Sequence, residues 1–118
     1  MVTLLLAQAL FVATPLTPPH SFTSGVEGPA TDRDGNIYAV SYQRTDTIGR
    51  VTPDGKAEIF VEMPAGSLGN GIRFTPEGRM FVADYKGHQI LEIDPKTRKI
   101  SVFGSISDRK STRLNSSH

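Results

Sequence analysis

The chain has 118 residues, no cysteine, and 13 Lys or Arg against 12 Asp or Glu, which gives a formal net charge of +1. This length suits one small domain, and the absence of cysteine excludes disulfide bonds and thiolate metal sites. The basic residues are scattered singly and do not form a cluster with aromatic residues. No nucleic-acid interface is therefore predicted.

The first 24 residues differ in composition from the rest. Residues 1–26 contain no Asp, Glu, Lys or Arg, and residues 4–13 are almost wholly apolar. An apolar run of about ten residues is too short to cross a bilayer, which takes about 20, so no membrane span is predicted. Residues 1–24 fit a secretory signal peptide and a Thr/Pro/Ser-rich linker, which predicts a secreted or periplasmic protein. The alternative is a buried or frayed N-terminal strand.

The middle of the chain reads as all-β. From residue 26 to residue 103, short apolar runs alternate with turn residues, and no run has the 3.6-residue period of a long helix. Two units repeat each other 43 residues apart, so that Gly28 matches Gly71 and Phe60 matches Phe103. Strands are expected near residues 29–31, 36–42, 47–52 and 57–62, and again near 72–74, 79–84, 88–94 and 99–103.

A repeat of about 40 to 50 residues with four short strands is typical of one β-propeller blade. The second strand of each unit is apolar on both faces, which favours sheets stacked face to face. Residues 25–107 are therefore predicted to be a partial β-propeller of two four-stranded antiparallel blades. Tyr42 and Tyr85 occupy matching positions in the two units and are expected to pack between blades.

Glu27 and Asn70 occupy the same place in successive units. Because blades are related by rotation about a central axis, matching residues at the inner ends of two blades converge on one mouth of the propeller. A carboxylate and an amide oxygen there are the hard donors that a divalent cation uses. The alternative is that Glu27 caps a turn and Asn70 belongs to an Asn-Gly turn.

Asp84 is a further candidate for the pocket, since Ser41 stands at its position in the first unit. An acid at the end of an inner strand can reach the same mouth. The alternative is a solvated acid in a turn.

Residues 108–118 match the translation of a common sequencing adapter in one reading frame, so this tail is expected to be disordered and foreign to the domain. The charged residues of this segment contribute +2, and without them the formal net charge is −1. The alternative is a real basic tail that binds anionic surfaces.

The middle of the chain resembles the gluconolactonase family, which includes regucalcin (senescence marker protein) and luciferin-regenerating enzyme. The resemblance covers about residues 25–103, and its motifs are Glu27-Gly28-Pro29, Asn70-Gly71, Phe74-Thr75-Pro76-Glu77-Gly78 and Val82-Ala83-Asp84. It implies a six-bladed propeller with one divalent cation, often Ca²⁺, in the axial mouth. It also implies hydrolysis of sugar lactones or related esters.

The resemblance also implies residue roles. Glu27 matches the first metal ligand of the family, and Asn70 matches the pocket asparagine that helps to position the substrate. The remaining ligands and the base of the family come from later blades, so this chain is expected to be an inactive N-terminal fragment.

Two other classes of propeller share these strands and turns. One is a non-catalytic NHL-type or scaffold propeller that binds protein or ligand partners, and it needs no later metal ligands. The other is a strictosidine-synthase-like propeller, which lacks the glutamate found at Glu27.

Overall fold

The computed structural model describes residues 11–26 and 28–105. They form two four-stranded antiparallel sheets, which confirms the predicted all-β class and the two four-stranded units. No helix in this part of the chain is long and apolar enough to cross a bilayer. The proposed signal peptide falls largely, and the adapter-like tail of residues 108–118 wholly, outside the described residues.

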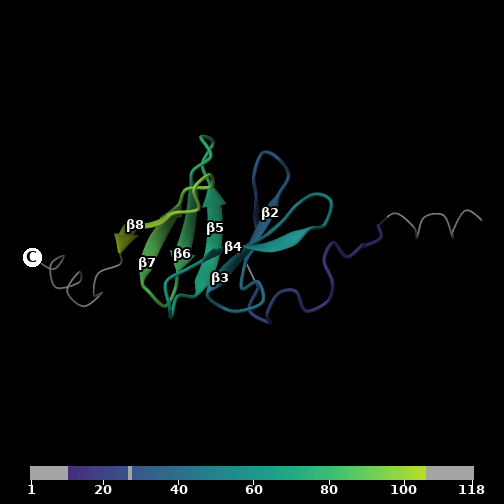
Figure 1. Ribbon diagram of the computed structural model, residues 1–118, viewed down its shortest axis with the longest axis horizontal. Helices are drawn as coiled ribbons and strands as arrows, with labels where there is room; N and C mark the ends of the chain where they lie inside the picture. The colour runs from purple at the N-terminus through teal and green to yellow at the C-terminus, as the bar shows by residue number, and fades with distance from the viewer. Residues whose placement is uncertain (1–10, 27, 106–118) are drawn as a thin grey trace, which may run out of the picture.

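Each sheet is a simple up-and-down meander in which neighbours in sequence pair in space (Figure 1). The first sheet contains β1 (Ala30–Thr31), β2 (Ile37–Val40), β3 (Thr47–Val51) and β4 (Ala57–Glu62). The second contains β5 (Gly69–Phe74), β6 (Met80–Asp84), β7 (Gln89–Ile93) and β8 (Ile100–Ser105). All eight predicted strands are present, with ends that shift by at most three residues.

Three of the turns within the sheets, those after β1, β3 and β5, contain a glycine that follows an acidic residue. Gly35, Gly55 and Gly78 have φ of 84°, 89° and 92°, a region that favours glycine because it has no Cβ. In the first turn, Asp32 Oδ1 accepts hydrogen bonds from the backbone N–H groups of Asp34 at 2.9 Å and Asn36 at 3.0 Å. Local side-chain hydrogen bonds thus stabilise this hairpin turn.

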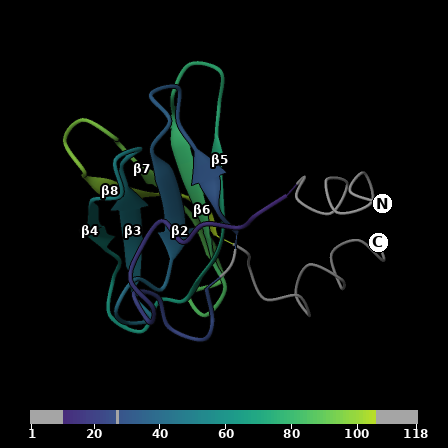
Figure 2. The same ribbon diagram turned by 90° about the vertical axis from the view of Figure 1, so that its right-hand side faces the viewer.

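The core lies between the two sheets, which pack face to face (Figure 2). β5, the first strand of the second sheet, contacts both β1 and β2. From the second sheet, Ile72, Val82 and Leu91 are fully buried against the first, where Val40 and Ile48 are also fully buried. The full burial of these side chains explains why the sheets hold together as one unit.

The same aromatic pair occurs on matching faces of the two sheets. Tyr38 and Phe60 meet edge to face at 5.1 Å, and Phe81 and Phe103 do so at 4.9 Å. The first pair is covered by the second sheet, whose Phe74 ring lies 5.1 Å from Tyr38. The second pair is open, and Phe103 is 60% exposed. The open face of the second sheet therefore repeats the surface that receives a neighbouring sheet on the first, as expected for propeller blades.

The two matching tyrosines do not share one environment. Tyr42 is buried and lies against Gly49, where an added Cβ would come within 2.5 Å of the Tyr42 Cβ. Tyr85 is 65% exposed, so it does not pack between these two sheets, and its packing against a further blade stays a prediction. By strand register Leu91 replaces Gly49 in the second sheet, so the second sheet has no glycine at the position where Gly49 lies against Tyr42.

Part of the predicted linker is bound to the first sheet. Phe22 forms a bridge with Tyr42 and stacks on it edge to face at 5.1 Å. Thr23 N–H donates to Ser41 O at 2.9 Å, and Gln43 N–H donates to Ser21 O at 3.0 Å. Residues 21–23 therefore belong structurally to the first sheet, although composition assigns them to the linker.

Replacement of a core leucine tests the stacking of the sheets. Leu91→Ala removes a fully buried side chain and is expected to lower the free energy of unfolding by about 2 to 5 kcal/mol, measured by urea denaturation. Val102→Ala, at a position 60% exposed, should change it by less than about 0.5 kcal/mol. Equal effects of the two variants would contradict this packing.

Candidate functional site

Two of the predicted site residues lie at the same end of the second sheet. Asn70 is the second residue of β5, and Asp84 is the last residue of β6. Gly69 and Asp84 are register partners across these strands. Asn70 follows Gly69 in the chain, so Asn70 and Asp84 lie at the same end of the sheet. Glu27, the third predicted residue, lies outside the described residues.

Asn70 is the extra residue of a β-bulge. Gly69 pairs with Asp84 and Gly71 with Ala83, so Asn70 has no partner on β6. A bulge bends its strand and re-aims a side chain, and bulges are common beside functional sites. The Asn70 side chain is exposed and makes no hydrogen bond within the part of the chain that the structure describes.

The backbone of Gly28 lies directly against this bulge. Gly28 O accepts a hydrogen bond from Ile72 N–H at 3.3 Å. Gly28 has φ of 61°, and a Cβ there would clash with Asn70 O and lie 2.7 Å from Gly71 Cα. Gly28 and Gly71 are matching positions of the two units, so matching backbone segments are neighbours at this end of the sheets. Only glycine allows that approach.

Asp84 has a buried carboxylate with four hydrogen-bond donors. Its side chain is only 2% exposed. The donors are Ser67 Oγ at 2.8 Å, Leu68 N at 3.0 Å, Gly87 N at 3.0 Å and Gln89 Nε2 at 2.9 Å. Burial acts to raise the pKa of Asp84, but these hydrogen bonds together outweigh it and hold the pKa below the usual value of an aspartate. The group is therefore a carboxylate at neutral pH.

The bonds to Asp84 fix two loops at the end of the second sheet that carries Asn70. They join the loop before β5 to the turn between β6 and β7. The predicted role of Asp84 as a pocket acid stays a prediction, and its observed contacts are structural. Nothing in the sequence singles out Ser67 or Gln89, since neither lies in a recognisable motif.

Ser41 occupies the position in the first unit that matches Asp84 in the second, and it has no acidic side chain. It is fully buried with φ of 66°, and its Oγ has no hydrogen-bond partner among the described residues. Here Thr47 Oγ1 organises the turn instead, by donating to Tyr42 O and lying 3.0 Å from Arg44 O. The two units therefore stabilise corresponding turns by different side chains.

The described residues do not by themselves form a cation site. In residues 11–26 and 28–105, no group of three or more His, Asp or Glu side chains is placed to hold a metal ion. Asp84 has both oxygens engaged by donors within the fold. At this end of the sheets, Asn70 offers one neutral oxygen, which is too few donors for a divalent cation.

The chain is similar to a gluconolactonase from Zymomonas mobilis subsp. mobilis. The two are 31% identical over 118 aligned residues, which cover 91% of this chain and 33% of that protein. The chain thus spans about a third of the length of the curated relative that it matches. No family model matches the chain.

A side chain at position 28 tests the contact between matching segments. Gly28→Ala is expected to lower the free energy of unfolding by about 2 kcal/mol or more, because a Cβ meets Asn70 O and the positive φ disfavours alanine. Gly71→Ala is the matched control, because no atom lies within 4 Å of a Cβ there. Chemical denaturation of both variants measures the difference. A Gly28→Ala variant with an unchanged free energy of unfolding would refute the close approach.

The contribution of Asp84 to the free energy of unfolding depends on pH. Because its folded-state pKa is depressed, the carboxylate stabilises the fold above about pH 4, and this contribution is lost as the pH falls through the folded-state pKa. Asp84→Asn should cost about 2 kcal/mol at pH 7 and progressively less below pH 4, measured by denaturation across pH. Glu77→Gln, at an exposed turn residue, is the control. A cost for Asp84→Asn that is constant with pH would contradict this prediction.

Proposed function

We propose that this chain is the N-terminal part of a metal-dependent lactonase that hydrolyses sugar lactones or related esters. The observation that carries the proposal is the similarity to a gluconolactonase along 91% of the chain. The two stacked four-stranded sheets are consistent with the opening blades of a propeller. A small-molecule lactone is therefore the proposed substrate class.

The arrangement at the bulge supports this proposal. Gly28 lies against Asn70 and Gly71, so two matching segments of successive sheets meet at one end of the sheet pair. Glu27 directly precedes Gly28 in the sequence, and we propose its carboxylate as the first ligand of the cation. Asn70, with its exposed carboxamide, is the proposed substrate-binding residue.

The proposed cation is Ca²⁺, because carboxylate and amide oxygens are the donors that this hard ion prefers. When bound, a divalent cation polarises a carbonyl and lowers the pKa of a coordinated water, which are the two changes that ester hydrolysis needs. Glu27 would hold the ion, and Asn70 would orient the substrate by hydrogen bonding. We further propose that the other ligands and the base belong to repeats beyond these two sheets.

The test uses the longer protein in which these two sheets are joined to the further repeats. Glu27→Gln should abolish Ca²⁺ binding by calorimetry and lower kcat/KM for glucono-lactone hydrolysis by about 100-fold or more, since a metal ion contributes several kcal/mol. Asn70→Ala should lower kcat/KM by about 3- to 10-fold, the effect of one hydrogen bond, while Ca²⁺ binding is retained. Lys99→Gln, at an exposed residue, is the control.

Two results would overturn the proposal. Ca²⁺ binding and turnover that survive Glu27→Gln would remove the proposed ligand. A longer protein that folds but hydrolyses no lactone would favour a non-catalytic binding propeller instead. The 118-residue chain alone is expected to show no turnover.

A further inference from the structure

The second sheet has a free outer edge. β8 is the last strand of this sheet, and within the described residues no strand pairs with its outer side (Figure 1). It lies on the side of the sheet away from β5, the strand that contacts the first sheet. A further sheet stacked on the open face would cover that face and leave this edge free. The edge is therefore a surface of its own, separate from the stacking of sheets.

The matching edge of the first sheet carries two acids that β8 lacks. Glu58 and Glu62 of β4 correspond to Ser101 and Ser105 of β8 at the repeat offset of 43 residues. Both acids form ion pairs, and Glu58 also holds Arg98 of the second sheet at 2.9 Å. None of the ion pairs among the described residues involves β8. Because charged side chains on an edge strand oppose pairing with another chain, β4 is protected and β8 is not.

Both edges share a second kind of protection, a β-bulge. Phe60 of β4 and Phe103 of β8 are matching residues, and neither has a partner in the register with the neighbouring strand. A bulge twists an edge and interrupts the row of backbone groups that another strand could use. Since both edges have it, they differ in charge alone. The bulge shortens the run that can pair, so a contact through β8 is expected to be weak.

The residues of β8 favour pairing with another strand. The strand reads Ile-Ser-Val-Phe-Gly-Ser, with no charged residue and no proline. Val102 and Phe103 are each 60% exposed, so apolar side chains stand beside the free edge. Short segments of this kind, rich in β-branched and aromatic residues and low in charge, pair readily with identical segments.

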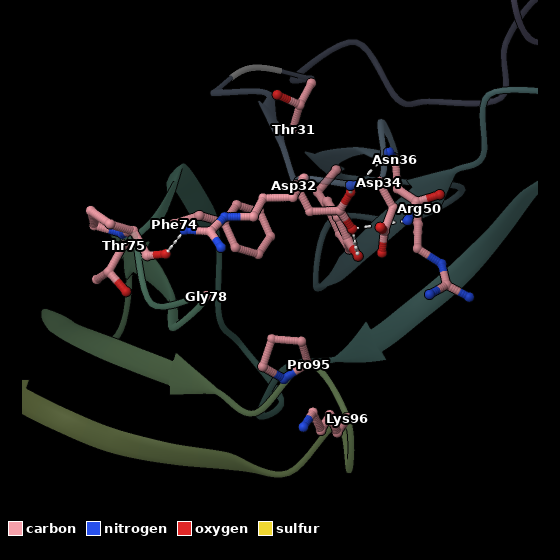
Figure 3. A pocket seen from close by; sticks show the side chains of 13 residues that line it. Thr31, Asp32, Asp34, Asn36, Arg50, Phe74, Thr75, Gly78, Pro95 and Lys96 are labelled. Atoms are coloured by element: carbon pink, nitrogen blue, oxygen red, sulfur yellow. Dashed lines mark hydrogen bonds between the residues drawn. The ribbon is translucent and has the colours of Figure 1, made fainter.

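Contacts between the two sheets fix the position of this edge. The turn before β8 is bound to β4, where Arg98 donates to Phe60 O at 3.3 Å. At the end of the sheets away from Asn70, turns of both sheets border a cleft of about 640 Å³ (Figure 3), and the Arg33 guanidinium donates to Pro76 O. β8 is therefore held on a rigid support, which lowers the entropy cost of pairing.

We propose that two copies of this chain associate through antiparallel pairing of their β8 strands about a two-fold axis. The pairing would continue the backbone ladder of each sheet, so that β7 and β8 of one copy are followed by β8 and β7 of the other. With no charge on β8, no like charges face each other, and a formal net charge of +1 gives little repulsion between the copies. The contact is separate from the Asn70 end, so it stands or fails independently of lactone hydrolysis.

The experiment measures the mass of the 118-residue chain by sedimentation equilibrium at increasing concentration. The average mass should rise from one chain toward two between about 10 μM and about 1 mM, the range expected of a small and weak interface. Hydrogen exchange gives an independent readout. Backbone amides of β8 that point away from β7 should exchange more slowly at the higher concentration, because a partner strand then protects them.

Matched variants place the charges of β4 on β8. Ser101→Glu combined with Ser105→Glu should raise the dissociation constant of the dimer by about 5-fold or more, since each strand then opposes a partner of like charge. β4 has glutamate at both matching positions, so the fold is expected to accept this change, and an amide NMR spectrum checks it. Ser101→Thr combined with Ser105→Thr is the control, which keeps β8 uncharged and should dimerise like the parent chain.

Three outcomes would overturn the proposal. A parent chain that stays monomeric at the highest of these concentrations would exclude the dimer. A double glutamate variant that dimerises like the parent chain would exclude β8 as the contact. A dimer that is weakened by Phe81→Ser but not by the glutamates would place the contact on the open face of the second sheet.

Discussion

The apolar contact between the two sheets is the constraint on which the other features depend. Each sheet has one face that is buried only against the other, and a side chain moved fully from water to such a core contributes about 1.5 to 3 kcal/mol. The fully buried apolar side chains of this core include Val40, Ile48, Ile72, Met80, Val82, Leu91 and Ile93. Once these faces meet, Gly28 is brought against the bulge at one end and the hairpin turns flank a cleft at the other. The two ends then differ in chemistry: backbone meets backbone at the first, and charged side chains reach across at the second.

Much of the fold was predictable because its signals are local. Acidic-Gly pairs mark the turns, and apolar runs of strand length mark the strands, so all eight strands were found. The different environments of Tyr42 and Tyr85 were not predicted. By register Leu91 stands where Gly49 stands in the first sheet, after a one-residue change in spacing between the units, so the glycine that allows the close approach of Tyr42 has no counterpart. A repeat identifies matching positions, but it does not show that their neighbours match in size.

The candidate site was predictable to a smaller extent. The phase of the repeat predicted that matching segments of the two units meet at one end of the sheets, and the contact of Gly28 with Asn70 and Gly71 agrees with this, whereas the role of Asn70 stays a prediction. The bulge at Asn70 was not predicted, since a single extra residue leaves no distinct pattern in the sequence. The four donors to Asp84 come from positions 67, 68, 87 and 89, and their convergence is a property of the folded loops.

The Arg79 side chain covers the exposed aromatic rings on the open face of the second sheet. Its guanidinium lies 4.9 Å from the Phe81 ring centroid and 5.8 Å from that of Phe103, and it is held by two hydrogen bonds of 2.8 Å to Glu92. During synthesis from the N-terminus, such a face stands bare until a neighbour arrives, and bare aromatic surface invites association with other chains. A charge seated over the rings makes that association costly, since any apolar partner must first strip water from an ion pair.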